Sequence, residues 1–238
     1  MLKKNKIAIF LAARSGSKRL PNKHFLKINT KLYVIDLCIK RLKKTKLVKK
    51  IFLCTTKKKL DDKFKKITKL HKINLFRGST NNVLKRYIDC AYENSIETIV
   101  RITADCPIID PKLIDKCVEL HFKNNCDYTT NTLKLSFPNG LDVEVIRLSS
   151  LIKSFKISKS KKNLEHVTSF IRSSKLFKKY NLKNNVNYSN RRWTLDYEKD
   201  YFFLKKVLTF FKPNIHFSWK DLIYAEKKNK YLMNIKRR

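Results

Sequence analysis

The feature of this sequence that most constrains its fold is the uninterrupted apolar run Ile7–Ala12 near the start of the chain. Six apolar residues without a polar alternation are typical of a β-strand that is covered on both faces. Strands of this kind occur in parallel sheets, where the connecting helices lie over the two faces. The run therefore predicts a central strand of an α/β fold.

Strand-like and helix-like patterns alternate through residues 1–130. Further strands are predicted at residues 51–54, 74–76 and 98–102, and helices at residues 32–42, 60–70, 81–92 and 110–122. The alternation predicts a Rossmann-like, mostly parallel central sheet with helices on both faces. Ligands of such sheets bind at the carboxyl ends of the strands. We therefore expect the loops after Ala12, Phe76 and Ile102 to converge on one site.

The second half of the chain has a less regular pattern. A turn at residues 137–140 precedes a predicted strand at 141–146, and a helix at 164–173, a strand at 192–195 and a helix at 197–211 follow. We see no internal repeat and no linker in this half. The sequence therefore predicts one domain, residues 1–238, with an elaborated second half.

The segment after the first predicted strand combines small residues with four cations, Arg14, Lys18, Arg19 and Lys23. The backbone N–H groups of residues 15–17 are candidates for an anion-binding nest, and the cations suit a polyphosphate. The segment matches neither the Walker A pattern nor the dinucleotide G-x-G-x-x-G pattern. From composition alone, a solvated basic loop is an equally good interpretation.

The net charge of +37 suggests a nucleic-acid-binding protein. We do not favour that function, because the cations are 44 lysines and only 12 arginines, spread along the whole chain. The six cysteines include no C-x-x-C pair, which favours buried, reduced thiols over a zinc site. No apolar stretch is long enough for a membrane span. We expect a cytoplasmic protein without a specific nucleic-acid or membrane partner.

Two aspartates, Asp105 and Asp196, each follow a predicted strand. Magnesium typically takes one or two carboxylates and completes its shell with phosphate oxygens and water, so these residues are candidate Mg²⁺ ligands. Local alternatives stay open for both residues. Asp105 is also suited to a turn before Pro107, and Asp196 to the N-cap of the next helix.

The segment A-R-S-G-S-K-R-L-P-N-K, residues 13–23, resembles the signature of sugar cytidylyltransferases. These enzymes make CMP-linked keto-deoxy-octulosonate and CMP-sialic acids, and the loop is most similar to that of their spore-coat polysaccharide relatives. The segments R-I-T-A-D-C-P-I-I-D and R-W-T-L-D-Y-E-K-D resemble the two acidic motifs of the family. The resemblance implies that Asp105 and Asp196 hold Mg²⁺ and that residues 1–130 form the nucleotide-binding half. Residues 131–238 then form the acceptor-side and metal-completing half.

Individual site residues follow from the same resemblance. It implies catalytic roles for Arg14, Lys23 and Asp105. The implied nucleotide-binding residues are Ala12, Ala13, Arg14, Ser15, Gly16, Ser17, Lys23, Arg77, Ser79 and Thr103, where Arg77 and Ser79 lie in the element R-G-S-T-N-N-V-L-K-R-Y near the cytosine and ribose.

Three further residues are implied on the acceptor side, Asp142, Glu144 and His166. They lie in the segments P-N-G-L-D-V-E-V and E-H-V-T, which resemble family elements. Strand alternation puts Asp142 and Glu144 on one face of a strand. A solvent-facing role for these acids, and a structural role for His166, are the alternatives.

The predicted reaction is transfer of CMP from CTP to a sugar acid or a related surface-polysaccharide precursor, with release of pyrophosphate. The resemblance also implies a homodimer. A nucleotide-sugar glycosyltransferase is an alternative, because Asp142-x-Glu144 is similar to the acidic motif of that class. A basic nucleic-acid-binding protein is the alternative from another class.

Overall fold

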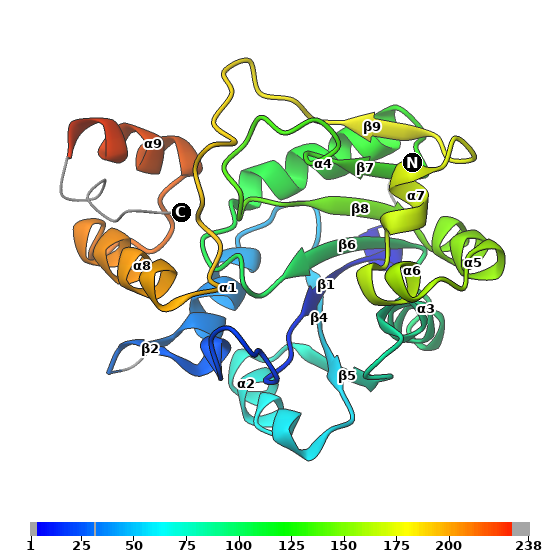
Figure 1. The fold of residues 1–238 in the computed structure, drawn as a ribbon, viewed down its shortest axis with the longest axis horizontal. Helices are drawn as coiled ribbons and strands as arrows, with labels where there is room; N and C mark the ends of the chain where they lie inside the picture. The colour runs from blue at the N-terminus through cyan, green and yellow to red at the C-terminus, as the bar shows by residue number, and fades with distance from the viewer. Residues whose placement is uncertain (1–3, 31, 230–238) are drawn as a thin grey trace.

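A computed structural model describes residues 4–30 and 32–229 of the chain (Figure 1). The strands are β1 Ile7–Ala12, β2 Lys27–Asn29, β3 Leu32–Tyr33, β4 Lys50–Thr56, β5 Asn74–Gly78, β6 Thr98–Thr103, β7 Tyr128–Thr130, β8 Glu144–Arg147 and β9 Lys179–Asn181. The α-helices are α1 Val34–Leu42, α2 Phe64–His71, α3 Val83–Glu93, α4 Pro111–Lys123, α5 Leu148–Ile157, α6 Lys161–His166, α7 Ser169–Ser173, α8 Glu198–Phe210 and α9 Trp219–Lys228.

Seven strands form the central sheet in the order β5-β4-β1-β6-β8-β7-β9. Strand β1 lies inside the sheet and pairs in parallel with β4 on one side and β6 on the other. Strand β8 is antiparallel to both β6 and β7. The predicted Rossmann-like, mostly parallel central sheet is therefore confirmed, with Ile7–Ala12 as one of its central strands.

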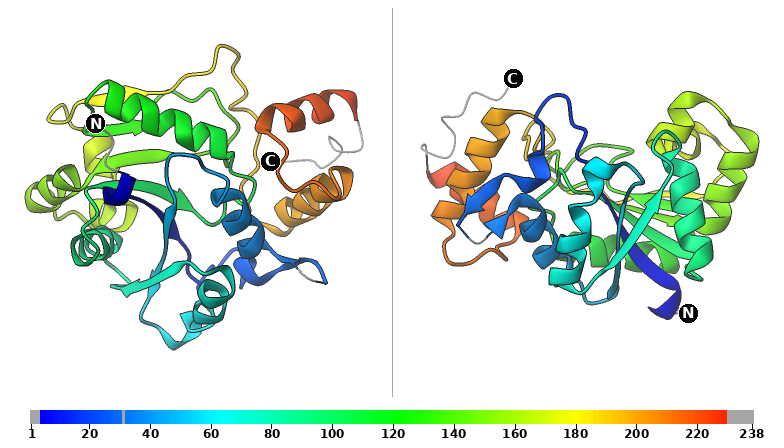
Figure 2. Two further views of the ribbon diagram at one scale, coloured as in Figure 1. Left: turned by 180° about the vertical axis from the view of Figure 1, so that it is seen from behind. Right: turned by 90° about the horizontal axis from the view of Figure 1, so that it is seen from below.

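Helices cover both faces of the sheet, as Figure 2 shows from two further sides. One apolar core packs one face against α1, α2, α4, α8 and α9, and includes Ile9 and Leu11 of β1. A second core packs the other face against α3, α5 and α7, and includes Ala8 and Phe10. Successive residues of β1 thus enter opposite cores, which is why its sequence is apolar throughout.

The strand predicted at residues 141–146 begins only at Glu144. The backbone groups of Leu141 and Val143 bond instead to the side-chain amide of Asn131. Ahead of them, Gly140 has a φ of 110°, which directs the chain away from a regular strand. The local hydrogen-bond partners therefore shorten the strand at its start.

Two other predicted elements in this half are also wrong in detail. The helix predicted at 164–173 is divided into α6 and α7, because Val167 adopts a φ of 62° between them. The strand predicted at 192–195 is reduced to one isolated bridge between Asn139 and Arg192. The sequence pattern also missed α5, α9 and the short strands β7 and β9, whose three residues each give too little periodicity to detect.

All six cysteines are buried and unpaired, as expected. Within residues 4–30 and 32–229, no helix has the length and apolar character needed to cross a membrane.

Candidate active site

Two adjoining cavities lie at the carboxyl ends of β1 and β6. The loop cavity, about 580 Å³, is lined by residues of the 12–24 segment together with residues of α3 and α6. The sheet cavity, about 550 Å³, extends over the segments around β7 and β8. Arg101, Thr103, Asp105 and His166 line both cavities. These four residues form the shared wall, where the contents of the two cavities can meet.

Most of the sequence-predicted nucleotide residues lie in the loop cavity. Its lining includes Ala12, Ala13, Arg14, Gly16, Ser17, Lys23 and Thr103. Parallel pairing of Ala12 with Cys54 and with Thr103 fixes the point at which the loop leaves the sheet. Within the described residues, Arg14 and Lys18 form no ion pair, so both charges are available to a ligand.

Ser15 does not join them. Its backbone N–H donates to Asp61 Oδ1 at 2.7 Å, and the residue is 4% exposed. Asp61 is itself held by the hydroxyl of Thr56. The predicted anion nest over residues 15–17 therefore loses its first N–H group. Ser15 does not line the loop cavity, and its bond to Asp61 holds the loop in place.

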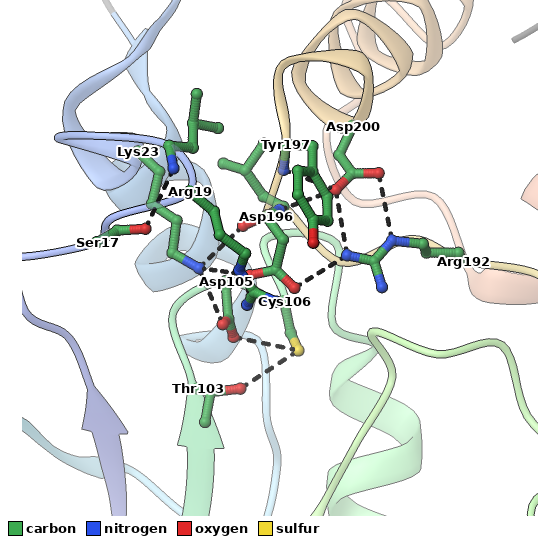
Figure 3. Close-up of polar contacts among 12 residues, drawn as sticks. Ser17, Arg19, Lys23, Thr103, Asp105, Cys106, Arg192, Asp196, Tyr197 and Asp200 are labelled. Atoms are coloured by element: carbon green, nitrogen blue, oxygen red, sulfur yellow. Dashed lines mark hydrogen bonds and ion pairs between the residues drawn. The ribbon is translucent and has the colours of Figure 1, made fainter. Parts of the chain in front are cut away.

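Lys23 lies between the two predicted metal ligands (Figure 3). Its Nζ is 3.0 Å from Asp105 Oδ2, 3.0 Å from Asp196 Oδ1 and 2.9 Å from the carbonyl oxygen of Leu195. Burial alone raises the pKa of Asp105, but Lys23 and a hydrogen bond from Thr103 outweigh burial and lower it. Burial likewise opposes Lys23 and Arg192 at Asp196, and the net pKa shift is again downward. Both carboxylates are therefore ionised at neutral pH.

Asp196 is more heavily neutralised than Asp105. Arg19 and Arg192 approach its two oxygens at 2.8 and 2.9 Å, in addition to Lys23. The side chain of Asp196 is 12% exposed, against 31% for Asp105. Its N-cap interpretation is wrong, because the N-cap of α8 is Tyr197 and the capping carboxylate is that of Asp200.

The described residues contain no group of three or more His, Cys, Asp or Glu side chains that could enclose a metal ion. Two carboxylates that converge on one cation position are nonetheless enough for Mg²⁺, which keeps water and phosphate oxygens in the rest of its shell. The donor set therefore fits an ion that arrives with a nucleotide better than a permanently enclosed metal.

The predicted acceptor residues Asp142, Glu144 and His166 all line the sheet cavity. Asp142 lies just before β8, where burial raises its pKa to about 6, aided by repulsion from Glu144 and Asp105. Glu144 is only 5% exposed, so the solvent-facing interpretation is wrong for this residue. His166 is exposed at the end of α6.

Arg77 and Ser79 lie outside both cavities. Arg77 donates to the carbonyl oxygens of Thr56 and Lys58 at 3.0 Å and pairs with Asp62 at 2.7 Å. Ser79 accepts a hydrogen bond from the backbone of Asn82 at the start of α3. Their placement gives no support to the predicted contacts with cytosine and ribose.

Arg86 and Arg101 line the loop cavity instead and were missed as site residues. Arg86 is 3% exposed, and among the described residues it has no carboxylate partner. A signal for it existed in Gly78, because a Cβ there would lie 2.7 Å from Arg86 Cγ. The signal for Arg101 was a charge between the apolar residues Val100 and Ile102 in a central strand.

Comparisons with known proteins show the family to which the chain belongs. The sequence model of a family described as cytidylyltransferase matches residues 8–234. An uncharacterised protein of Methanocaldococcus jannaschii is 39% identical over 201 residues, covering 82% of this chain and 80% of that protein. The spore coat polysaccharide biosynthesis protein SpsF of Bacillus subtilis is 30% identical over 174 residues, covering 71% of each chain. A solved cytidylyltransferase structure from Leptospira borgpetersenii superposes with a TM-score of 0.93 at 33% identity, over 98% of both chains.

Proposed function

Because this chain belongs to the cytidylyltransferase family, we propose that it transfers CMP from CTP to a sugar acid or related surface-polysaccharide precursor, releasing pyrophosphate. Family membership makes the chain a nucleotidyltransferase that uses CTP. The acceptor class, the metal and the roles of individual residues are the parts that we propose.

The shared wall of the two cavities is the observation that carries this proposal. A transferase must hold two substrates so that the attacking oxygen and the phosphorus atom meet. The loop cavity and the sheet cavity each have the volume for one small ligand and meet at Arg101, Thr103, Asp105 and His166. We assign CTP to the loop cavity and the acceptor to the sheet cavity.

The loop cavity suits the triphosphate. Arg14 and Lys18 offer charges that no described residue pairs with, and Gly16 and Ser17 offer backbone in the lining. Lys23 holds the carboxylates of Asp105 and Asp196 until a ligand arrives and can then share its charge with phosphate oxygens. Family-type roles for Arg14, Lys23 and Asp105 in catalysis agree with this placement.

Asp105 and Asp196 are the residues that would hold Mg²⁺, with Asp105 the more accessible of the two. When bound, the ion supplies neutralisation of the negative charge that develops on the phosphates. Asp105 lines both cavities, so its carboxylate lies next to both proposed substrates.

The sheet cavity suits a polyhydroxylated acid. Thr132, Asn139, Ser189 and Thr194 bring hydrogen-bonding side chains into its lining. Among residues 4–30 and 32–229, the buried hydroxyl of Thr194 has no hydrogen-bond partner, which is costly unless a ligand supplies one. Arg172 donates to Tyr128 and Thr132, which fixes its guanidinium in the lining of the same cavity. Its side chain is 34% exposed, and it is the candidate for binding a sugar carboxylate.

In the reaction, an acceptor hydroxyl oxygen forms a bond to the α-phosphorus of CTP. The bond from this phosphorus to the bridging oxygen breaks, and pyrophosphate leaves with the bonding electrons. The acceptor proton passes to solvent in the sheet cavity. Positioning and charge neutralisation by the side chains of the two cavities supply the rate increase.

Incubation of the purified protein with CTP, MgCl₂ and inorganic pyrophosphatase tests the proposal. The acceptors are keto-deoxy-octulosonate and N-acetylneuraminate, and the measurements are phosphate release and the mass of the CMP-linked product. ATP, GTP and UTP are the control nucleotides. Turnover of UDP-sugars without any reaction of CTP would point to the glycosyltransferase alternative. Duplex binding that persists at 150 mM salt, roughly the physiological range, would revive the nucleic-acid alternative.

A homodimer stays a prediction, which sedimentation of the purified chain would test.

A further inference from the structure

Arg101 places a charge in the middle of a central strand. Its neighbours Val100 and Ile102 are fully buried, and its own side chain is 22% exposed. A guanidinium at a position between two fully buried residues is costly unless it is paired and hydrogen-bonded. That position is the wall shared by the loop cavity and the sheet cavity.

Glu144 holds Arg101 in this position. The two residues are directly opposite in the β6–β8 register and form an ion pair through Arg101 Nη1 and Glu144 Oε2. The other oxygen of Glu144 accepts hydrogen bonds from the hydroxyls of Tyr128 and Thr168. Both oxygens of Glu144 are therefore occupied inside the protein, which leaves little capacity to bind an acceptor directly.

Arg101 itself still has donors to give. Its Nε is buried and has no hydrogen-bond partner in the part of the chain that the structure describes. Burial lowers the pKa of Arg101, but the adjacent Glu144 outweighs burial and raises it, so the side chain keeps its charge. An orientated guanidinium with an unused donor thus lies in the wall where the two substrates must meet.

We propose that Arg101 is a catalytic residue that contacts the phosphoryl group during its transfer, and that Glu144 is the positioning residue that aims it. This inference rests on the proposed function. In the step, the acceptor oxygen–phosphorus bond forms while the bond from phosphorus to the bridging oxygen breaks. Negative charge then grows on oxygens at the shared wall, and a pre-orientated guanidinium stabilises that charge more than it stabilises bound CTP.

A purely structural ion pair is the competing explanation, and the chain contains a matched example of one. Arg191 pairs with Glu226 at 2.8 Å, with side chains 20% and 2% exposed. Glu226 also accepts from the indole N–H of Trp193, as Glu144 accepts from Tyr128. Arg191 lines neither the loop cavity nor the sheet cavity. Arg191→Gln therefore reports the loss of a similar ion pair away from the substrates.

The experiment compares Arg101→Lys, Arg101→Gln and Arg191→Gln in the intact chain with Mg²⁺, CTP and the two sugar acids named above. We expect Arg101→Gln to lower kcat by about 100-fold, the usual effect of losing one donor to a developing charge. Arg101→Lys keeps the positive charge but loses the planar, forked donor group of arginine. Its kcat is expected to lie between that of Arg101→Gln and that of the parent protein. Arg191→Gln is expected to lower the Tm with little change in kcat.

Binding measurements separate transition-state contact from ordinary nucleotide binding. The Kd of the unreactive α,β-methylene analogue of CTP is expected to change by less than about fivefold in Arg101→Gln, because the lost interaction belongs to the transition state. Glu144→Gln is expected to lower kcat less than Arg101→Gln does, with KM for CTP nearly unchanged. Added guanidinium is expected to restore part of the kcat of Arg101→Ala.

Several results overturn the inference. Parent-like kcat in folded Arg101→Gln, while the parent protein is active, would make the Arg101–Glu144 pair structural and leave the proposed function intact. Equal losses of kcat in Arg101→Gln and Arg191→Gln would have the same meaning. No pyrophosphate release by the parent protein with any acceptor would overturn both the inference and the proposed function.

Discussion

Lys23 Nζ lies 3.0 Å from Asp105 Oδ2, which joins the loop after β1 to the end of β6 (Figure 3). The same nitrogen lies 3.0 Å from Oδ1 of Asp196, a residue 173 positions further along the chain. Three segments that are remote in sequence thus meet at one ammonium group. Its position, between two carboxylates, is also where a divalent cation would be attracted.

Removal of this ammonium is expected to make the protein more responsive to magnesium. In Lys23→Met, two ionised carboxylates face each other without the central charge, which we expect to cost about 2 kcal/mol of stability without metal. Because Mg²⁺ can neutralise the same oxygens, adding MgCl₂ is expected to raise the Tm of the variant more than that of the parent protein. Thermal unfolding at pH 7.5 over a MgCl₂ series measures the difference.

Lys63→Met is the control, since Lys63 bonds to Asn22 and lines neither cavity. An equal response to MgCl₂ in the parent protein and both variants would show that no cation site exists between Asp105 and Asp196.

The pH dependence of Asp142 gives a second prediction. Its pKa in the folded protein is raised from 3.8 to about 6, so the folded state binds more protons than the unfolded state between these values. Stability from this group is therefore greatest below pH 3.8, falls as the pH rises towards 6, and stays lower above it. Asp142→Asn removes this cost of ionising a buried carboxyl group, and we expect it to raise the unfolding free energy at pH 7.5 by up to about 3 kcal/mol.

Urea unfolding of the parent protein and Asp142→Asn between pH 4 and pH 8 measures this effect. The difference in unfolding free energy between the two proteins is expected to become smaller towards pH 4. A difference in unfolding free energy that does not change with pH would mean that the pKa of Asp142 is the same in the folded and the unfolded chain.

The loop after β1 was predictable because its placement depends on local sequence and parallel topology. Ile7–Ala12 defines the strand, and Ala12 then pairs with Cys54 and Thr103, so Lys23 and Asp105 had to lie at the same edge of the sheet. The side-chain positions of Arg77 and Arg86 were not predictable in the same way. They depend on how α3 packs over β5, and the close approach of Gly78 to Arg86 is a tertiary contact without periodic signature.

The second half was harder to predict for a related reason. Asn131 bonds the backbone of Leu141 and Val143, and Glu144 accepts from residues of β6, β7 and the α6–α7 junction. Partners so distant in sequence override local strand and helix propensities. The side chains that form the sheet cavity are therefore set by long-range hydrogen bonds.

Gly140 provides a third prediction about the same region. Its φ of 110° is strained for any other residue, and an added Cβ would lie 2.7 Å from the backbone carbon of Trp193. Gly140→Ala is expected to cost at least about 2 kcal/mol of unfolding free energy and to displace the segment that leads to Asp196. Gly16→Ala is the stability control, because nothing lies within 4 Å of a Cβ there. Similar urea midpoints for the two variants would contradict this account of Gly140.

The fourth prediction concerns which of two arginines, Arg77 or Arg86, binds the nucleotide. Arg86 is buried at the loop cavity without a carboxylate partner among the described residues, and its Nε has no hydrogen-bond partner. Arg77 is already bonded to Thr56, Lys58 and Asp62 outside both cavities. A phosphate or ribose oxygen of CTP would supply what Arg86 lacks, whereas Arg77 gains nothing from a ligand in the loop cavity.

We therefore expect Arg86→Gln to weaken binding of CTP about tenfold, close to 1.4 kcal/mol, and Arg77→Gln to weaken it much less. Calorimetric titration with the α,β-methylene analogue of CTP measures both, and Tm values show whether each variant is folded. Gly78→Ala is an independent check, since its Cβ displaces Arg86 Cγ and should weaken binding without removing any charge. The reverse order of affinities would restore Arg77 as the nucleotide residue and leave Arg86 a buried charge that the loop cavity tolerates without using.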